Sequence, residues 1–329
     1  MPVRMPHRPV RPLTVAAAAC ALAFAAACVP GVGRDPGPAG PPETRSLLGQ
    51  PLYAPELPLD QRQRLEAQLD SARLAFEARP DDPGAMIWYG RRLAYLGEYR
   101  AAVDLYREGT RRHPRDARFY RHRGHRLITL RRFGEAVRDL ERAARLVRGR
   151  PDQVEPDGVP NAAGVPLSTL QGNIHYHLGL AYYLRGEFLR AAQAFRTALS
   201  LAQNDESRVA SSDWLYMSLR RAGRHAEAQA VLEPIRPGLQ LRENEPYYQR
   251  LLMYKGLVPP DSLLDTNGRG TDAVTLAYGV GNWHLYNGRR DEAEQIFLRI
   301  TQGENWAPFG YIAAEADLRR LTREKLRRR

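Results

Sequence analysis

The sequence predicts an all-α fold, built as a solenoid of antiparallel helix pairs. Apolar residues recur at spacings of three and four from Leu59 onward, which is the helical period, and no stretch alternates as a strand would. The pattern then returns after 34 residues, so that positions of one copy match positions of the next: Gly90 and Gly124, Leu93 and Leu127, Tyr99 and Phe133, Ala102 and Ala136. A fixed interval of this kind indicates stacked repeat units rather than one large core.

The first helix is predicted over residues 59–79, and Pro80 and Pro83 end it. Residues 28–58 before it are rich in proline and glycine, which predicts a linker without a core of its own. The solenoid is then expected over 59–329. Its helix pairs are expected near 83–116, 117–150, 172–205, 209–242 and 274–307, with a degenerate pair at 243–272 and a terminal helix at 308–329.

Within each pair, a small residue in the first helix and an alanine in the second let the two helices approach closely. The third copy shows this pattern with Gly179 and Ala191, and with Phe188 and Phe195 for packing. Four copies in register resemble the tetratricopeptide repeat family over residues 59–321. The resemblance implies a right-handed superhelix whose first helices line a concave groove that binds peptides or partner proteins.

The resemblance also implies which side chains face the groove, because fixed positions of each first helix do so in this family. Carried over to this sequence, these positions give a basic and aromatic surface that suits an acidic partner. The predicted groove residues are Arg91, Tyr95, Arg118, Arg121, His125, Asn173, Tyr176, Tyr183, Tyr278, Asn282 and Tyr286.

An insertion interrupts the repeat before the third copy, and it covers residues 149–171. Long loops in compact repeats are usually functional or disordered. We hypothesise that this one folds over the groove entrance near Tyr176 and Arg121 and gates it. Its acids Asp152, Glu155 and Asp157 would then rest on the basic groove in place of an acidic ligand.

No catalytic, cofactor or metal site is predicted. His175 and His177 would point about 200° apart on a helix and cannot share one metal ion. Residues 265–272 resemble a calcium loop, but Leu263 and Val274 would occupy its first and last ligand positions. The chain is therefore predicted not to be an enzyme; the alternative is an unrecognised active site under the 149–171 loop.

Residues 1–27 are predicted to be a signal peptide. Arginines precede an apolar stretch at 13–28 that is too short to span a bilayer comfortably. Small residues before Cys28 resemble a bacterial lipoprotein signal, which would make Cys28 the lipid anchor. The alternative is cleavage by an ordinary signal peptidase after residues 25–27, which would release a secreted soluble protein. Cys20 lies inside the apolar stretch, so the mature chain could form no intrachain disulfide.

The net charge of +12 comes almost entirely from arginine and is distributed without a nucleic-acid-binding motif, so no nucleic-acid partner is expected. The sequence as a whole favours a non-catalytic scaffold that binds a protein or peptide at the bacterial cell envelope. It would be a periplasmic or outer-membrane lipoprotein, held at the membrane through its lipid anchor. A narrower alternative is a subunit of an outer-membrane assembly or secretion complex.

Overall fold

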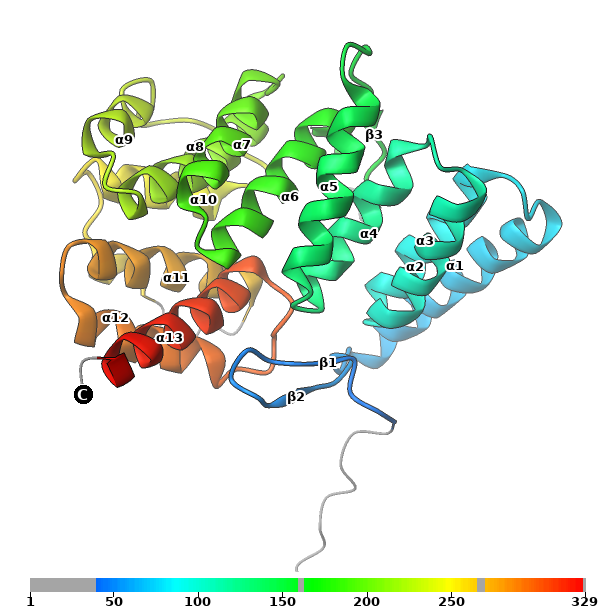
Figure 1. The fold of residues 1–329 in the computed structure, drawn as a ribbon, viewed down its shortest axis with the longest axis horizontal. Coiled ribbons are helices and arrows are strands. Elements are labelled where there is room, and N and C mark those ends of the chain that lie inside the picture. The colour runs from blue at the N-terminus through cyan, green and yellow to red at the C-terminus, as the bar shows by residue number, and fades with distance from the viewer. Residues whose placement is uncertain (1–39, 159–162, 265–269, 328–329) are drawn as a thin grey trace, which may run out of the picture. The chain divides into compact units, whose positions relative to one another are not determined.

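The computed structural model describes residues 40–158, 163–264 and 270–327. Thirteen α-helices dominate these residues, and successive helices pack as antiparallel pairs, so the predicted all-α solenoid is confirmed (Figure 1). The predicted signal peptide and Cys28 lie outside the described residues. No described helix is both long enough and apolar enough to cross a bilayer.

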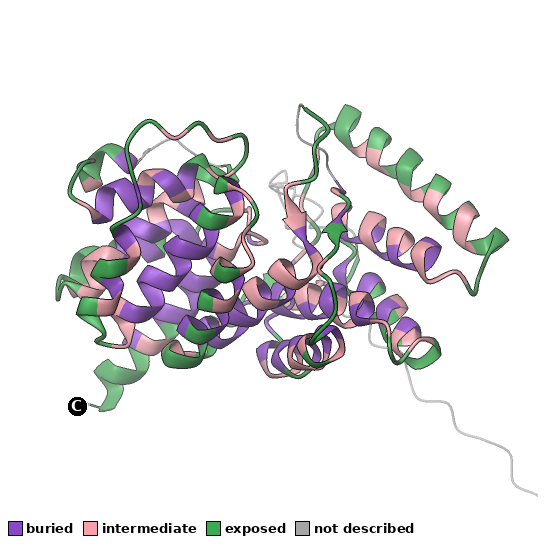
Figure 2. Cartoon of the chain, turned by 90° about the horizontal axis from the view of Figure 1, so that it is seen from above, coloured by how far each residue is buried: buried purple, intermediate pink, exposed green. Residues whose placement is uncertain are grey.

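Helix α1 (Leu59–Ala78) precedes the pairs and has no buried residue (Figure 2). Four regular pairs follow. Helix α10 comes next, and the described residues between it and the last pair form a 3-10 turn, η1; the terminal helix follows the last pair. The bounds are α2 Pro83–Tyr95 with α3 Tyr99–Arg112, α4 Ala117–Thr129 with α5 Phe133–Val147, α6 Leu170–Arg185 with α7 Phe188–Ser200, α8 Asp205–Arg221 with α9 His225–Leu232, α10 Glu245–Tyr254, η1 Pro260–Leu263, α11 Thr271–Tyr286 with α12 Arg290–Thr301, and α13 Phe309–Arg327.

The repeated small residues do bring the paired helices together. A Cβ placed on Gly90 of α2 would lie 2.4 Å from the Tyr106 ring of α3, and one on Gly179 of α6 would lie 2.8 Å from the Phe195 ring of α7. Both distances are shorter than any real contact, so the ring of the second helix occupies the space that a side chain would need.

The degenerate copy differs from its prediction. A degenerate helix pair was expected over 243–272, but the described residues that follow Pro259, up to residue 264, form only the 3-10 turn η1. Proline restricts the residue before it and removes a backbone donor, so helix α10 has no regular partner. Tyr216, which takes the small-residue position of the fourth copy, stacks instead on Tyr254 of α10, with ring centroids 4.4 Å apart.

Residues 41–57 do not form the free linker that composition predicts. They include a hairpin of two short strands, β1 (Thr44–Arg45) and β2 (Pro51–Leu52), and Leu52 is buried. The Thr44 hydroxyl donates to the carbonyl oxygen of Leu130 at 2.9 Å, and Trp306 Nε1 donates to the carbonyl oxygen of Tyr53 at 2.6 Å. Proline and glycine exclude a helix here, but they do not exclude a segment held by helices already formed.

Helix α13 covers the last pair, as the terminal element of a solenoid must, and also reaches back to α6. The guanidinium of Arg320 donates to the carbonyl oxygen of Tyr183, 3.0 Å away at the end of α6. This contact joins residues far apart in the sequence and places α13 against the end of α6.

Candidate functional site

The predicted groove residues fall into two groups in the structure. One group lies on α2, α4 and the start of α6, close to the inserted loop. The other group lies on the end of α6 and on α11, within reach of α13. The first group consists of Arg91, Tyr95, Arg118, Arg121, His125, Asn173 and Tyr176, and the second of Tyr183, Tyr278, Asn282 and Tyr286.

In the second group, the prediction that Tyr183, Tyr278 and Asn282 are available to a partner is wrong. All three are 0% exposed. The hydroxyl groups of Tyr183 and Tyr278 are 2.8 Å apart, and Tyr278 donates to Asp317 Oδ2 of α13 at 3.0 Å. Burial raises the pKa of Tyr183 to about 12. These side chains hold the terminal helix and face no open groove.

Arginines of α8 contact the side chains of Asn282 and Tyr286. Arg221 donates to Asn282 Oδ1 at 3.0 Å and also pairs with Asp317. Arg220 lies over the ring of Tyr286, 4.2 Å from its centroid. Both residues therefore belong to the contacts among α8, α11 and α13.

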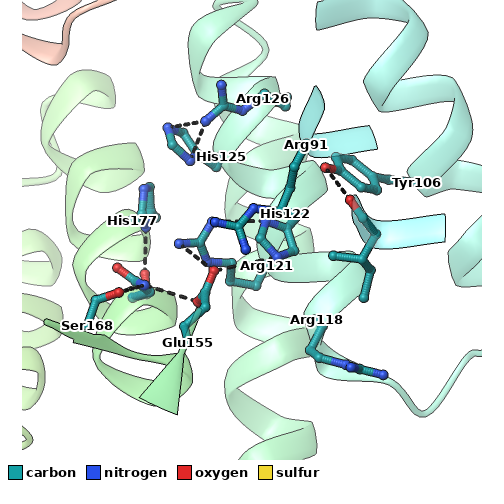
Figure 3. A network of polar contacts seen from close by, with 12 residues as sticks. Arg91, Tyr106, Arg118, Arg121, His122, His125, Arg126, Glu155, Ser168 and His177 are labelled. Carbon is teal, nitrogen blue, oxygen red and sulfur yellow. Dashed lines mark hydrogen bonds and ion pairs between the residues drawn. The ribbon is translucent and has the colours of Figure 1, made fainter. Parts of the chain in front are cut away.

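Two residues of the first group, Arg121 and Asn173, hold one carboxylate of the inserted loop, Glu155 (Figure 3). Glu155 lies in strand β3 (Val154–Glu155), which pairs with β4 (Ser168–Thr169). Its Oε1 is 3.0 Å from Arg121 Nη2, and both side chains are at most 9% exposed. Asn173 Nδ2 donates to the other oxygen of Glu155 at 3.0 Å. Arg121 is thus buried beneath the loop. The prediction that it lines an open groove is wrong.

Of the three loop acids expected to rest on the basic groove residues, only Glu155 does so. Asp152 accepts hydrogen bonds from the backbone of Gln153 and Gln171, at the start of α6, and does not reach the arginines. Asp157 has a raised pKa because of burial and the nearby Glu243, although Arg91 lowers it. Only Glu155 is therefore clamped by the basic surface.

Residues 155–158 also cover α2. The carbonyl oxygen of Gly158 accepts from Arg92 Nη1 at 3.0 Å. A Cβ on Gly158 would lie 1.5 Å from the hydroxyl oxygen of Tyr95. Arg91 lies over the ring of Trp88, 4.3 Å from its centroid. The backbone of the loop thus touches α2 so closely that only glycine fits at 158.

Three histidines line the interior behind Glu155. His125 and His177 have ring centroids 4.2 Å apart, and His122 Nε2 lies 3.5 Å from Glu155. The pKa of each is lowered well below its ordinary value, first by burial and then by neighbouring arginines. Burial therefore disfavours their charged forms, and the rings of His125 and His177 pack against each other. No group of three or more potential metal ligands occurs in the part of the chain that the structure describes.

His175 and His177 play different parts, as helical geometry requires. His177 is buried, and its Nδ1 lies 2.7 Å from the carbonyl oxygen of Asn173, whereas His175 is half-buried. Arg118 does not contact Glu155: it pairs with its neighbour Asp116 and borders a pocket of about 690 Å³, which residues 150–153 of the inserted loop also line.

A second pocket of about 220 Å³ lies beside the loop, and sequence reasoning missed most of it. Tyr176 borders it, and its hydroxyl donates to that of Tyr247 on α10 at 3.3 Å. Glu206 of α8 also borders it and accepts the backbone N–H of Asn244 at 3.0 Å. These residues come from separate repeats, and their positions within each repeat carry no signal that they meet.

The fold defines a helical-repeat protein. Within it, residues 172–205, the third copy, match the tetratricopeptide repeat family model. No curated protein is significantly similar to the chain in sequence.

Among solved structures, the chain is similar to YrrB, a TPR protein with an unusual peptide-binding site, at 16% identity and a TM-score of 0.41, over 78% of this chain and 99% of that one. It is also similar to a chain of Naa15/Naa10 bound to HypK-THB, at 15% identity and a TM-score of 0.35, over 81% of this chain and 39% of that one. A chain of the APC/C hetero-tetramer Cut9–Hcn1 matches at 13% identity and a TM-score of 0.35, over 80% of this chain and 64% of that one.

Proposed function

We propose that this chain is a non-catalytic scaffold that binds a protein or peptide partner on the surface formed by α2, α4 and the start of α6. The observation that carries the proposal is the clamp around Glu155. Arginine and asparagine side chains from successive first helices hold the carboxylate of a non-helical segment. A rigid surface that holds one extended acidic segment is suited to hold another.

The described residues beneath the loop give no support to the enzyme alternative. The Glu155 carboxylate there is held by Arg121 and Asn173, and burial lowers the pKa of the neighbouring His122. A role in an outer-membrane assembly or secretion complex is a narrower form of the scaffold proposal, and the identity of a co-purified partner would decide it.

The partner-binding surface is tested by replacing Arg91 and Arg92 together with alanine. Both side chains are partly exposed, and their loss removes positive charge and the contact with the Gly158 carbonyl oxygen. Affinity purification of the tagged chain from native membranes should recover about tenfold less partner with this variant, as expected for a loss of about 1.4 kcal/mol.

The matched control removes two arginines from the outer helix α3, Arg107 and Arg111, whose side chains are 57% and 75% exposed. It should recover as much partner as the wild type. Equal recovery with both double variants would contradict the proposed surface.

We also propose that the chain is exported and anchored through a lipid on Cys28. The support is the sequence before Cys28, because this region lies outside the described residues. Growth with a labelled fatty acid should label the wild type and the control variant Cys20→Ser, but not Cys28→Ser. Labelling that persists in Cys28→Ser would disprove Cys28 as the anchor, and an unlabelled wild type would favour the secreted soluble form.

A further inference from the structure

Residues 154–158 lie on the proposed surface as a separate peptide would. Strand β3 pairs antiparallel with β4, Val154 opposite Thr169 and Glu155 opposite Ser168. The backbone N–H of Leu170 donates to the carbonyl oxygen of Gln153 at 2.8 Å. The segment is therefore held by backbone pairing, as in peptides that add a strand to an exposed edge.

The side chains of this segment contribute little to the core. Val154 is 60% exposed, and Pro156 is exposed as well. Its inward contacts include those of the Glu155 carboxylate with Arg121 and Asn173 and that of the Gly158 backbone with Arg92. The helices behind the segment, α4, α5 and α6, contact one another directly, so we expect that it could leave without unfolding them.

Strand β4 would stay in place if β3 left. Thr169 is the N-cap residue of α6, and its hydroxyl accepts the backbone N–H of Gly172 at 3.2 Å. Such a cap fixes the residue to its own helix. The pairing edge of β4 is therefore set by α6 and remains available to another strand.

The charge around Glu155 is not balanced. Arg121 has a lowered pKa because burial disfavours its charge, and Glu155 offsets this only in part. Arg91 and Arg126 add further positive charge, and Arg121 Nε is buried without a hydrogen-bond partner. A single carboxylate at this point is strongly favoured, and its loss would leave a buried cation uncompensated.

The position of Asp157 differs from that of Glu155. It borders the 220 Å³ pocket together with Glu243, and the two acids disfavour each other. A neutral residue would therefore suit this place better than the aspartate that the chain carries. The structure thus distinguishes a required acid at 155 from an unfavourable one at 157.

We propose that residues 154–158 occupy the site of an extended partner peptide. In this peptide a glutamate is followed three residues later by a glycine, and the residue directly before the glycine is not acidic. This peptide would pair with β4, place its glutamate on Arg121 and its glycine on Tyr95, and displace the chain's own segment. The inference rests on the proposed function and adds the chemistry of the partner. The tethered segment competes with a free peptide at an effective concentration on the order of 1 mM, so it occupies the site in the wild type.

The test uses a labelled peptide with the chain's own residues 153–158, Gln-Val-Glu-Pro-Asp-Gly, and fluorescence anisotropy with the full chain. The variant Glu155→Gln weakens the binding of the chain's own segment to the site. The Kd of this variant for the labelled peptide should therefore be at least about tenfold below that of the wild type. The matched control Glu135→Gln, at a 43% exposed position on α5, should bind as the wild type does. The peptide with asparagine for its aspartate should bind more tightly, and the one with glutamine for its glutamate should not bind.

A second variant, Gly158→Ala, displaces the segment without removing a charge, since the new Cβ collides with Tyr95. It should also bind the peptide more tightly than the wild type does, even if Glu155→Gln fails to fold. If neither variant binds the peptide better than the wild type, the inference is overturned. If replacing Arg91 and Arg92 still reduces partner recovery, the proposed function stands even though this inference has failed. If the peptide binds but that replacement leaves partner recovery unchanged, the proposed function is the one that fails.

Discussion

Replacement of Asp213 by asparagine is expected to lower the free energy of unfolding by about 3–5 kcal/mol, because it leaves a buried guanidinium without its counter-charge. Asp213 of α8 and Arg250 of α10 are both 0% exposed, with Oδ2 and Nη2 2.7 Å apart. Arg250 also donates to the carbonyl oxygen of Thr275 on α11 at 3.1 Å. The pair therefore ties three helices of the irregular region together.

The guanidinium of Arg250 cannot move aside to reach water. Its side chain passes over Gly279 of α11, where a Cβ would lie only 2.4 Å from Arg250 Nε. Tyr254 and the sulfur of Met217 occupy further sides, at 3.3 Å and 2.9 Å. Such enclosure makes relaxation costly, so the asparagine variant should show nearly the full penalty.

Urea unfolding followed by circular dichroism measures this effect. The double variant Asp213→Leu with Arg250→Met should recover most of the loss, because apolar residues of similar volume replace the pair without leaving a lone charge. Asp104→Asn removes an acid that is 65% exposed and paired with Arg107, so it should change stability far less. An Asp213→Asn midpoint equal to that of Asp104→Asn would show that Arg250 finds solvent.

The repeat architecture could be predicted from the sequence because it depends on local signals. Glycine recurs where two helices cross, and aromatic residues recur where their rings fill the crossing, as with Gly90 and Tyr106. Both signals lie within one copy of 34 residues. They therefore need no knowledge of how distant segments pack.

The open surface could be predicted only in part, because exposure depends on segments outside the repeat. Tyr183 and Tyr278 occupy groove positions by register, yet α13 returns and buries both. Arg121 was correctly placed near the loop, but its burial depends on Glu155, which is 34 residues further along the chain. No periodic pattern specifies such a contact.

The same limitation applies to residues 41–57, whose composition is that of a linker. Besides the contacts of Thr44, Tyr53 and Leu52, these residues are held by a buried carboxylate, Glu315 of α13, which is 0% exposed. It accepts the backbone N–H of Leu47 at 3.2 Å and two hydrogen bonds from Arg131, at 3.0 Å and 2.7 Å. Glu315 thus joins the N-terminal segment, the turn between α4 and α5, and the terminal helix.

Arg131 adopts a backbone conformation that is unusual for an arginine. Its φ is 61°, whereas the corresponding turns of other copies have glycine at positive φ, as at Gly97 and Gly186. A side chain in this region costs on the order of 1–2 kcal/mol. The contacts that Arg131 makes with Glu315 and with the carbonyl oxygen of Trp306, 3.0 Å away, must exceed this cost.

Glu315→Gln is therefore expected to lower the free energy of unfolding by about 3–5 kcal/mol, because Arg131 stays buried at 3% exposure without its counter-charge. Arg131→Gly removes the same contacts but also relieves the backbone strain. Its decrease in the free energy of unfolding should therefore be about 1–2 kcal/mol smaller than the contacts alone would cause.

Both variants should also release residues 41–57. Limited proteolysis reports that release separately from global unfolding: cleavage within 41–57 should become faster below the unfolding midpoint, while cleavage in α3 stays slow. Unchanged cleavage of 41–57 in Glu315→Gln would mean that the hairpin is held by Trp306 and Leu52, and that Glu315 stabilises only the contact between Arg131 and α13.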